Sequence, residues 1–272
     1  MSFSADWLAL RRAADSRARA DTLAQALAQW LRHHDDPTRT VYLDLGSGSG
    51  ANCLHLCDQF DTQRDWLLID HDATLLDQAQ RQCSTRAAVR TLHCDLAGSL
   101  AGLPWTQAAL VTASALLDLV SAHWLTQLAT LAAAQRLPLL LALSYDGRIA
   151  LQPQSPDDAW LCRTVNSHQR GDKGFGPALG PDSIGHCAQL LRDRGYWVQL
   201  QDSDWMLDAS HSADAALLRP LLTGWAEAAA ETEPTQRARL TQWLQQRLAE
   251  VGQGNLRVRV GHQDLLALPP PA

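Results

Sequence analysis

Three aspartates each end a short apolar run of the sequence: Asp44 in VYLDL, Asp70 in WLLID and Asp95 in LHCD. The first is followed by a glycine-rich stretch, GSGSG, at residues 46–50. Glycines allow the backbone to approach a ligand closely, and a helix that begins after them would present free N–H groups. Carboxylates at Asp70 and Asp95 could accept hydrogen bonds from ribose hydroxyls and from the amino group of an adenine. This combination predicts a site for a nucleotide-like ligand.

The glycines also fit the fingerprint of a dinucleotide site. Gly46, Gly48 and Ala51 match G-x-G-x-x-G/A, and Asp70 stands where that fold places a ribose-binding acid. Asp44 argues against this interpretation, because a carboxylate two residues before the first glycine would repel a pyrophosphate but could anchor an ammonium group. We therefore expect a cationic cofactor. Helix capping remains an alternative role for the acids that end the second and third runs, since carboxylates are favoured at N-caps.

A parallel sheet would bring the three acids to one edge. From residue 41 onward, short apolar runs alternate with helical patterns, which predicts strands joined by right-handed crossovers and covered by helices on both faces. Before residue 40, apolar residues at helical spacing predict one or two N-terminal helices. The strands are expected at residues 41–45, 66–70, 89–96, 108–114, 137–145 and 196–207, with a last, alternating strand at 256–268 that closes the sheet as an edge.

Together these features resemble the class I S-adenosylmethionine-dependent methyltransferases, over residues 40–207 and the final strand. The resemblance implies an α/β fold with a Rossmann-like, doubly wound, seven-stranded, mostly parallel sheet whose last strand is antiparallel. It implies that the turn from Asp44 to Gly50 lies against the methionine part of the cofactor, that Asp70 holds the ribose, and that Asp95 meets the adenine. Further cofactor contacts expected on the same basis are Gly46, Ser47, Gly48, Asn52, His71, Leu96, Ser114 and, from the N-terminal helix, Arg11.

The methyl acceptor should lie beyond the ends of the first, fourth and fifth strands. The segment after the fourth strand, residues 112–124 (TASALLDLVSAHW), lacks the [ND]-P-P-[YF] tetrapeptide of many methyltransferases that act on nucleic acids and proteins, so a small molecule is favoured. Asp118 and His123 near this strand end are candidate bases, as are Tyr145 after the fifth strand and His168 further along. Among these, His168, Tyr145 and Asp118 are the expected catalytic residues.

Residues 146–180 are rich in glycine and proline and lack a clear helical or strand pattern. Such a long irregular insertion is usually functional or mobile, and glycines beside charged residues suit a lid over a substrate. The other expected divisions are a helical cap at 1–39, a main domain at 40–272 and two extra helices at 208–252, which would shape the acceptor pocket or a dimer contact. The expected substrate contacts in the lid are Arg148, Arg170, Lys173 and Phe175, whose three cations would suit a carboxylate or phosphate.

Two further groups of residues have an ordinary structural interpretation and a functional one. Arg11, Asp15 and Arg19 recur at i, i+4 steps in the first predicted helix, a pattern that is most often a surface ion-pair ladder. Trp7, Trp124 and Trp205 could place an aromatic face near a positively charged sulfonium, although the hydrophobic core is the more common place for each.

Composition argues against several classes of protein. The formal net charge of −6 and the pI near 5.9 argue against a broad phosphate-binding face, so no nucleic-acid partner is expected. No apolar run reaches the roughly 18 residues of a membrane span, and no secretion signal is evident, so we expect a cytoplasmic protein without a membrane partner. The six cysteines show no C-x-x-C pair and no zinc-ligand spacing, which predicts free thiols and no metal.

The expected activity is transfer of the methyl group of S-adenosylmethionine to an O or N atom of a small, anionic acceptor, with S-adenosylhomocysteine as the product. Three alternatives remain open: an aminopropyltransferase of the same fold, a non-catalytic S-adenosylmethionine-binding protein, and a nicotinamide-dependent dehydrogenase. The basic lid disfavours the first, because a polyamine substrate calls for acids. Asp44 disfavours the last, because it would repel a pyrophosphate.

Overall fold

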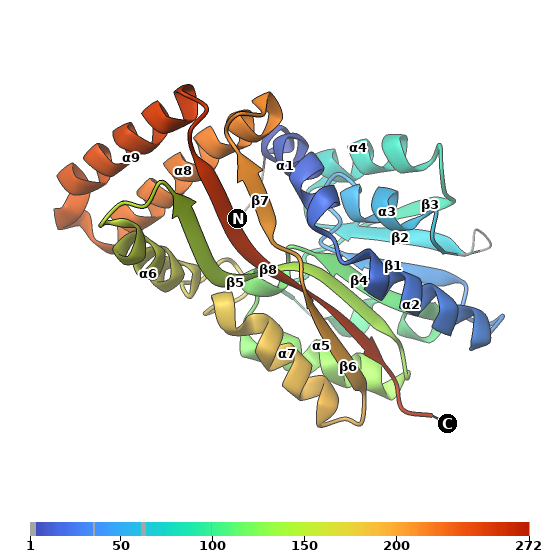
Figure 1. Ribbon diagram of the computed structural model, residues 1–272. Helices are drawn as coiled ribbons and strands as arrows, with labels where there is room; N and C mark the ends of the chain where they lie inside the picture. Colours follow the sequence, from blue (N-terminus) through green and yellow to red (C-terminus); the bar gives the residue numbers. More distant parts are fainter. Residues whose placement is uncertain (1–3, 35, 61–63, 99, 272) are drawn as a thin grey trace.

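In a computed structural model of the protein, a mixed β-sheet carries helices on both faces (Figure 1). The structure describes residues 4–34, 36–60, 64–98 and 100–271. The strands follow the order β3-β2-β1-β4-β5-β8-β6, and β7 pairs with β8 beside this path. All pairs from β3 to β5 are parallel, whereas β8 is antiparallel to β5, β6 and β7. The expected α/β fold, with a mostly parallel sheet and an antiparallel last strand, is thus confirmed.

Strands and helices alternate along the chain up to β5, as the apolar runs indicate. The strands are β1 (Val41–Leu45), β2 (Asp65–Asp70), β3 (Val89–His93), β4 (Ala108–Ser114), β5 (Leu139–Gln152), β6 (Trp197–Asp202), β7 (Trp205–Asp208) and β8 (Arg257–Leu268). The helices are α1 (Ala5–Ala18), α2 (Asp21–His33), α3 (Ala51–Leu56), α4 (Ala73–Cys83), α5 (Ala122–Ala134), α6 (Asp158–Gln169), α7 (Ser183–Arg192), α8 (Ser212–Thr232) and α9 (Arg237–Gly252), with short 3-10 turns that include η3 (Leu117–Leu119).

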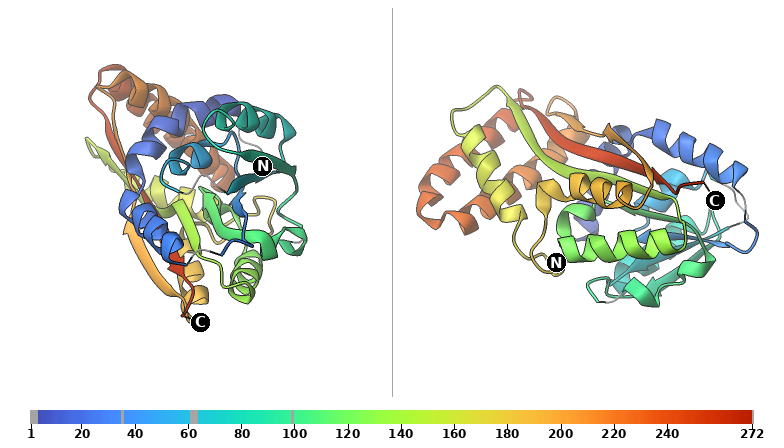
Figure 2. Two further views of the ribbon diagram at one scale, coloured as in Figure 1. Left: turned by 90° about the vertical axis from the view of Figure 1, so that its right-hand side faces the viewer. Right: turned by 90° about the horizontal axis from the view of Figure 1, so that it is seen from below.

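The central strands are apolar on both faces because helices cover both sides of the sheet (Figure 2). Every residue of β1 is buried, and its alternate side chains belong to two different cores. Leu43 packs with the apolar faces of α5 and α7, whereas Tyr42 packs with α2, α3 and α4. This two-sided burial fixes where the carboxyl ends of the parallel strands lie, and therefore where the three aspartates meet.

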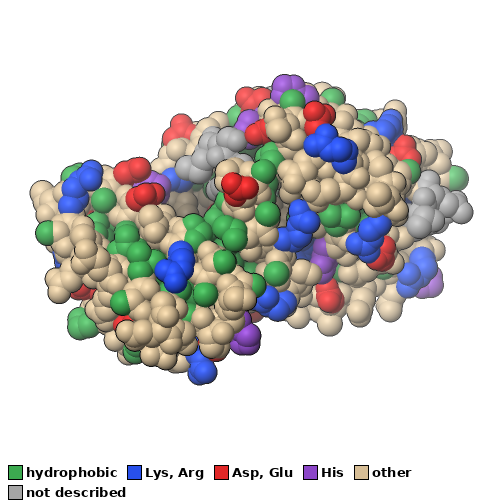
Figure 3. All heavy atoms as spheres, turned by 90° about the horizontal axis from the view of Figure 1, so that it is seen from above, with side chains coloured by type: hydrophobic (Ala, Val, Ile, Leu, Met, Phe, Trp, Pro, Cys, Tyr) green, Lys and Arg blue, Asp and Glu red, His purple; other side chains and the backbone are tan. Residues whose placement is uncertain are grey.

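A second packing unit extends from the sheet where β5 and β8 continue together. Residues 149–152 of β5 pair with residues 257–260 of β8, and α6, α8 and α9 pack on this extension around a core of their own (Figure 1). Figure 3 shows hydrophobic side chains gathered mainly on the half of the molecule that holds these helices. Helix α1 contacts α8 and β7 of this extension, and its Arg12 donates a hydrogen bond to Gln82 on α4, so the N-terminal helix joins the extension to the helices of the main sheet.

Three expectations about the C-terminal half are wrong. The strand expected at 196–207 is broken at Ser203 and Asp204, because β6 pairs with the second half of the long β8 and β7 with its first half. The described part of the chain therefore contributes eight strands to the sheet, and not the expected seven. Strand β8 lies between β5 and β6 and is not an edge. The segment 146–180 is not wholly irregular, since it begins with the last residues of β5 and contains α6.

No helix in the described ranges is long and apolar enough to cross a membrane. Over the same ranges, no cluster of three or more histidine, cysteine, aspartate or glutamate residues could hold a metal ion. All six cysteines are free thiols.

Candidate cofactor and acceptor site

The glycine turn joins the carboxyl end of β1 to the first turn of α3. Gly46, Gly48 and Gly50 have positive φ angles of 65°, 50° and 85°. Residues other than glycine rarely adopt positive φ angles. A Cβ atom on Gly50 would in addition lie 2.6 Å from Cys83 Sγ, on the neighbouring helix α4. The turn therefore depends on glycine for its backbone conformation and for its close packing against α4.

Asp70, at the end of β2, holds this turn in place. Its Oδ2 accepts a hydrogen bond from Gly48 N (2.8 Å), and its Oδ1 accepts one from Asp72 N (3.0 Å). The N-cap of α4 is Asp72, whose carboxylate accepts from the first turn of that helix. Asp70 is thus free of the capping role and remains at the strand end, where Asp95, beyond β3, accepts a hydrogen bond from Ala97 N (2.9 Å).

Both carboxylates line a cavity of about 530 Å³, which we call the strand-end cavity. Its size is in the range of pockets that hold small organic ligands. It is enclosed by α1, the glycine turn, the ends of β2 to β4 and residues 173–175. All expected cofactor contacts except Asp44 and Gly50 line it: Arg11, Gly46, Ser47, Gly48, Asn52, Asp70, His71, Asp95, Leu96 and Ser114.

Asp44 lies beneath the floor of the strand-end cavity and is fully buried. Its Oδ1 accepts a hydrogen bond from Asn52 Nδ2 (2.6 Å), and Asn52 Oδ1 accepts one from Arg19 Nη2 (2.8 Å). Burial raises the pKa of Asp44 to about 7, although Asn52 and Arg19 act in the opposite direction. Asn52 lines the cavity and Asp44 does not, so the carboxylate would influence a bound ligand through Asn52 and by its charge.

A second cavity of about 380 Å³ adjoins the first, and we call it the indole cavity because Trp7, Trp205 and Trp225 line it. It lies between α1, α6 and α8 and the β5–β8 extension. Its walls are mainly apolar, while its ionisable groups are Arg11, Asp118, Tyr145, His168, Lys173 and His262. The three expected catalytic residues therefore come together in one place.

The two cavities meet at Arg11, Ala115, Leu119 and Lys173, which line both of them. Arg11 forms an ion pair with Asp15 (2.8 Å), and its guanidinium lies 5.0 Å from the centre of the Trp205 ring. The N-terminal helix thus reaches the point of contact between the cavities. A ligand in one cavity and a ligand in the other would face each other across these four residues.

The buried polar groups of the indole cavity have altered acidities. Burial raises the pKa of Asp118 to about 6, although backbone N–H groups and Arg11 counteract part of this effect. Burial also raises the pKa of Tyr145, whose hydroxyl donates a hydrogen bond to Asn166 Oδ1 (2.7 Å). A carboxyl group whose pKa is shifted toward neutrality, in a cavity, is typical of functional sites.

Two expected substrate contacts lie elsewhere. Arg148 forms ion pairs with Asp146, Asp202 and Asp204 and lines neither cavity, because the register shift in β5 between Tyr145 and Ile149 turns this stretch of the strand. Arg170 is exposed and pairs with Asp182 (2.7 Å).

Two more candidate site residues lie elsewhere than expected, and Trp124 has the structural place that was given as the more common one. His123 lies exposed on α5 and contacts Gln127, so it does not reach either cavity. Trp124 is core, since its Nε1 donates to Leu96 O (2.7 Å) and its ring packs edge-on against Phe175. Phe175 was expected to contact the substrate, but it lines the strand-end cavity and not the indole cavity, so it lies beside the expected cofactor contacts.

Several residues of the site carry no signal in the sequence. His262 lines the indole cavity from β8, and Trp225, which belongs to the core of the extension, also lines it from α8. Arg19 is buried beneath the strand-end cavity, where its i, i+4 spacing suggested a surface ladder. Leu143 and Ala115 line the indole cavity with φ angles of 53°, a strained conformation that often marks functional sites.

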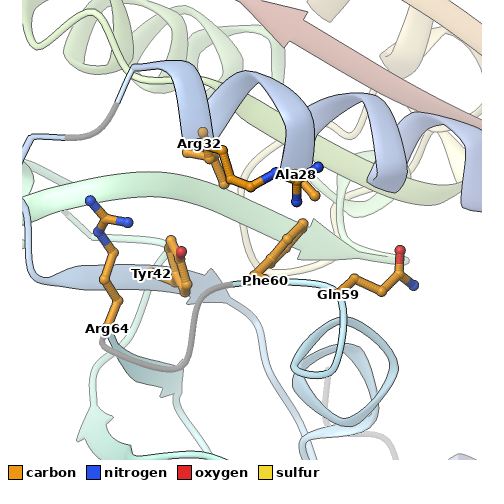
Figure 4. A pocket seen from close by; sticks show the side chains of 7 residues that line it. Ala28, Arg32, Tyr42, Gln59, Phe60 and Arg64 are labelled. Atoms are coloured by element: carbon orange, nitrogen blue, oxygen red, sulfur yellow. The ribbon is translucent and has the colours of Figure 1, made fainter.

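A third cavity, of about 380 Å³, lies under α2 near the start of β1 (Figure 4). Tyr42, Phe60 and Arg64 line it together with residues of α2. It contains none of the expected site residues, and it is remote from the carboxyl ends of the strands. We assign it no part in the site.

Replacing His262 by asparagine is expected to make the protein more resistant to acid. Burial, and secondarily Arg11, lowers the pKa of His262 to about 4, so the folded protein holds the imidazole neutral. Between pH 6.5 and pH 4 the unfolded chain takes up this proton more readily, so the wild type loses stability as pH falls, by up to about 3 kcal/mol. Asparagine does not titrate and can still donate a hydrogen bond to Val260 O, as His262 Nδ1 does.

The measurement is urea unfolding of both proteins at pH 7 and pH 4.5. Asp44 and Asp118, whose pKa values are raised, titrate in the opposite sense, because their folded state gains stability as pH falls. Asp44 and Asp118 are present in both proteins, so their contributions cancel in the difference between the two unfolding free energies. A difference in unfolding free energy that does not change with pH would contradict the prediction.

Comparisons with known proteins give structural likenesses only. No protein-family model and no curated protein matches the chain. Among solved structures, it is similar to an S-adenosylmethionine-dependent methyltransferase from Thiobacillus denitrificans in complex with S-adenosyl-L-homocysteine, at 17% identity, 100% coverage of both chains and a TM-score of 0.46.

Two bacterial proteins show the same degree of likeness. A putative methyltransferase from Bacillus halodurans matches at 12% identity over 90% of this chain and 99% of that chain, with a TM-score of 0.49. The YcgJ protein of Bacillus subtilis matches at 13% identity over 92% and 99%, also with a TM-score of 0.49. Such identities and TM-scores are too low to carry a functional assignment, which has to come from the residues of the site.

Proposed function

We propose that the protein is an S-adenosylmethionine-dependent methyltransferase that acts on an O or N atom of a small molecule. The observation that carries the proposal is the pair of adjoining cavities. One is bounded by the glycine turn, Asp70 and Asp95, and the other contains the candidate bases. A methyl donor and an acceptor need this arrangement, since the reaction depends chiefly on aligning the two reacting atoms.

The residues present fit the cofactor. Ser47 Oγ at the strand-end cavity and Asp44 Oδ2 beneath it are buried and have no hydrogen-bond partner within the described ranges. Buried polar atoms are nearly always paired, so these suit a polar ligand or a bridging water. We assign the ribose to Asp70, the adenine to Asp95 and Leu96, and the methionine part to the glycine turn. Arg11, Asn52, Ser114 and His71 complete the set.

When bound, S-adenosylmethionine supplies a methyl group on a positively charged sulfur and leaves as S-adenosylhomocysteine. The chain's own residues provide alignment and a dry environment. Arg11, Ala115, Leu119 and Lys173 surround the point where the cavities meet, and the apolar walls of the indole cavity exclude water around the acceptor. Asp118, Tyr145 and His168 lie within that cavity as candidates to bind or deprotonate the acceptor.

The acceptor is proposed to have an apolar, aromatic body, because three tryptophans line the indole cavity. An anionic group on the acceptor was expected from three cations, of which only Lys173 lies at this cavity, together with Arg11. An aminopropyltransferase is disfavoured, since Asp118 is the one carboxylate that the described residues contribute to the lining, and a polyamine calls for several. The lid, a homodimer and a cytoplasmic location stay predictions.

The activity is tested with S-adenosylmethionine labelled in its methyl group, offered with a panel of phenols, amines and carboxylic acids. Label in a methylated product supports the proposal and names the acceptor class. Absence of label in every product, in a protein that binds S-adenosylhomocysteine tightly, would favour the non-catalytic alternative.

Gly224→Leu is expected to abolish turnover of that acceptor and to leave the affinity for S-adenosylhomocysteine within about twofold. Gly224 lines the indole cavity from α8, and a Cβ atom there would meet no other atom within 4 Å. The new side chain would therefore occupy the cavity without a clash, and leucine favours a helix over glycine by about 1 kcal/mol. Methyl uptake and calorimetric titration are the measurements.

Gly185→Leu is the matched control, because Gly185 lies on the exposed side of α7 and also has no atom within 4 Å of its Cβ position. It should retain wild-type turnover. Wild-type turnover in Gly224→Leu would show that the acceptor binds outside the indole cavity.

A further inference from the structure

Lys173 is the only lysine in the chain; all other members of its 23 lysines and arginines are arginine. The two side chains differ in one property that matters at a reaction centre. The guanidinium of arginine stays protonated in proteins, whereas the amine of lysine can lose its proton when it is buried. Among the lysine and arginine side chains of this protein, Lys173 is therefore the one that can lose its proton and then accept another.

This lysine lies at the meeting point of the two cavities. Its residue is 6% exposed, and it lines both the strand-end cavity and the indole cavity. The loop from Arg170 to Leu179 carries it there, between α6 and the turn that precedes α7. If this position needed only a positive charge to hold an anionic substrate, an arginine would serve, and every other residue of the lysine and arginine set is an arginine.

A chain of hydrogen bonds leads from Lys173 to solvent. Lys173 Nζ lies 3.3 Å from His168 Nδ1, and His168 Nε2 lies 2.9 Å from Glu231 Oε2. The carboxylate of Glu231 can only accept, so Nε2 carries the hydrogen and Nδ1 accepts from the lysine. Both nitrogens of a neutral His168 are thereby engaged. The Glu231 side chain, on α8, is 72% exposed.

The charged groups around Lys173 act on it in opposite directions. Burial lowers the pKa of its amine, while the charges of Glu231 and Asp118 raise it. Arg11 faces the same meeting point from α1.

We propose that neutral Lys173 accepts the proton of the methyl acceptor, and that His168 and Glu231 conduct this proton to solvent. In this step the acceptor's O–H or N–H bond breaks and the proton binds the lone pair of the lysine amine. The electron pair left on the acceptor atom forms the bond to the methyl carbon, while the methyl–sulfur bond breaks toward sulfur. The inference rests on the proposed function and assigns His168 a positioning and relay role.

The same geometry indicates the acceptor class. Burial lowers the pKa of the Lys173 amine from its ordinary value of about 10.4, in the direction of a phenol, whose pKa is about 10, as in tyrosine. An aliphatic alcohol is far less acidic and would hold its proton. The tryptophans of the indole cavity suit the ring of a phenol. A phenolic hydroxyl is therefore the acceptor that this site would deprotonate.

The first test measures the lysine directly. Protein labelled with ¹³C at lysine Cε gives a single lysine signal, whose pH titration reports Lys173 alone. We expect a midpoint below 10.4, with and without S-adenosylhomocysteine, and a further decrease in Glu231→Gln, because that change removes a charge that stabilises the ammonium. Glu227→Gln, an exposed site on the same helix, should leave the midpoint unchanged. A midpoint at or above 10.4 in the wild type would overturn the inference.

The second test separates a base from a cation. Lys173→Met and Lys173→Arg are both expected to lower kcat on a phenolic acceptor more than 100-fold, with S-adenosylhomocysteine affinity retained, since arginine keeps the charge but cannot accept a proton. Near-wild-type kcat in Lys173→Arg would show that the charge alone is needed and would overturn the inference. Failure of the proposed function is distinguishable from either result, because the wild-type protein would then transfer no methyl group to any acceptor, and the inference would fall with it.

Discussion

Asp70→Ala is expected to bind S-adenosylhomocysteine about 100-fold more weakly than the wild type. The change removes the acceptor for Gly48 N, which holds the glycine turn, and it removes the carboxylate to which we assign the ribose hydroxyls. Hydrogen bonds to a charged group contribute about 1.5–3 kcal/mol each, and a loss of roughly 3 kcal/mol corresponds to about 100-fold in affinity. Calorimetric titration of both proteins measures the difference.

Asp77→Ala is the control for this change, because Asp77 is exposed on α4 and lines no cavity. The folded state of both variants is checked by urea unfolding. An affinity in Asp70→Ala within a few-fold of the wild type would mean that the ligand does not contact this strand end, and the assignments of Asp95 and the glycine turn would fail with it.

Asp158→Ala is expected to destabilise the protein by about 3 kcal/mol, because the buried Arg247 loses both hydrogen bonds to Asp158 and keeps Glu250 as its ion-pair partner. Arg247 on α9 is fully buried, and its Nη2 donates to both carboxylate oxygens of Asp158 on α6, at 2.7 Å each. Asp158 also accepts from Trp243 Nε1 (2.9 Å). This contact anchors α6, which carries His168 into the indole cavity, to the helices of the extension.

The neighbouring residue provides a matched control. Asp157 forms its ion pair with the exposed Arg239, and surface pairs contribute roughly 0–1 kcal/mol. Asp157→Ala should therefore change the unfolding free energy by less than about 1 kcal/mol. Urea unfolding measures both values, and the slope of unfolding free energy against urea concentration should be the same in the variants as in the wild type. Equal effects of the two substitutions would contradict the view that the buried Arg247 is the cause.

The lining of the strand-end cavity is local in sequence, which is why the convergence of these residues could be predicted. Each acid stands within a few residues of its strand end, and the glycine turn directly follows β1, so the order of strands in a parallel sheet is enough to bring Asp70 and Asp95 together. Asp44 was placed at the correct strand end, but its burial beneath Asn52 depends on Arg19 from the N-terminal segment. No spacing along the chain predicts that contact.

The indole cavity is assembled from distant segments, and its lining was predicted less well. Tyr145, His168 and Lys173 reach the indole cavity, but His262 comes from the last strand and Glu231 from α8, which meet the others only through tertiary packing. Arg148 follows its strand as closely as Tyr145 does, yet the register shift in β5 turns it toward three aspartates. Such a shift depends on pairing with β8, which the sequence of β5 alone does not specify.

The most direct test of the central claim is calorimetric titration of wild-type protein, stripped of bound small molecules, with S-adenosylhomocysteine and separately with NADH. Binding of S-adenosylhomocysteine at one site per chain, without binding of NADH, is the result we predict from Asp44, Asp70, Asp95 and the glycine turn. Binding of NADH alone would instead identify the strand-end cavity as a dinucleotide site and would contradict the proposed methyl transfer.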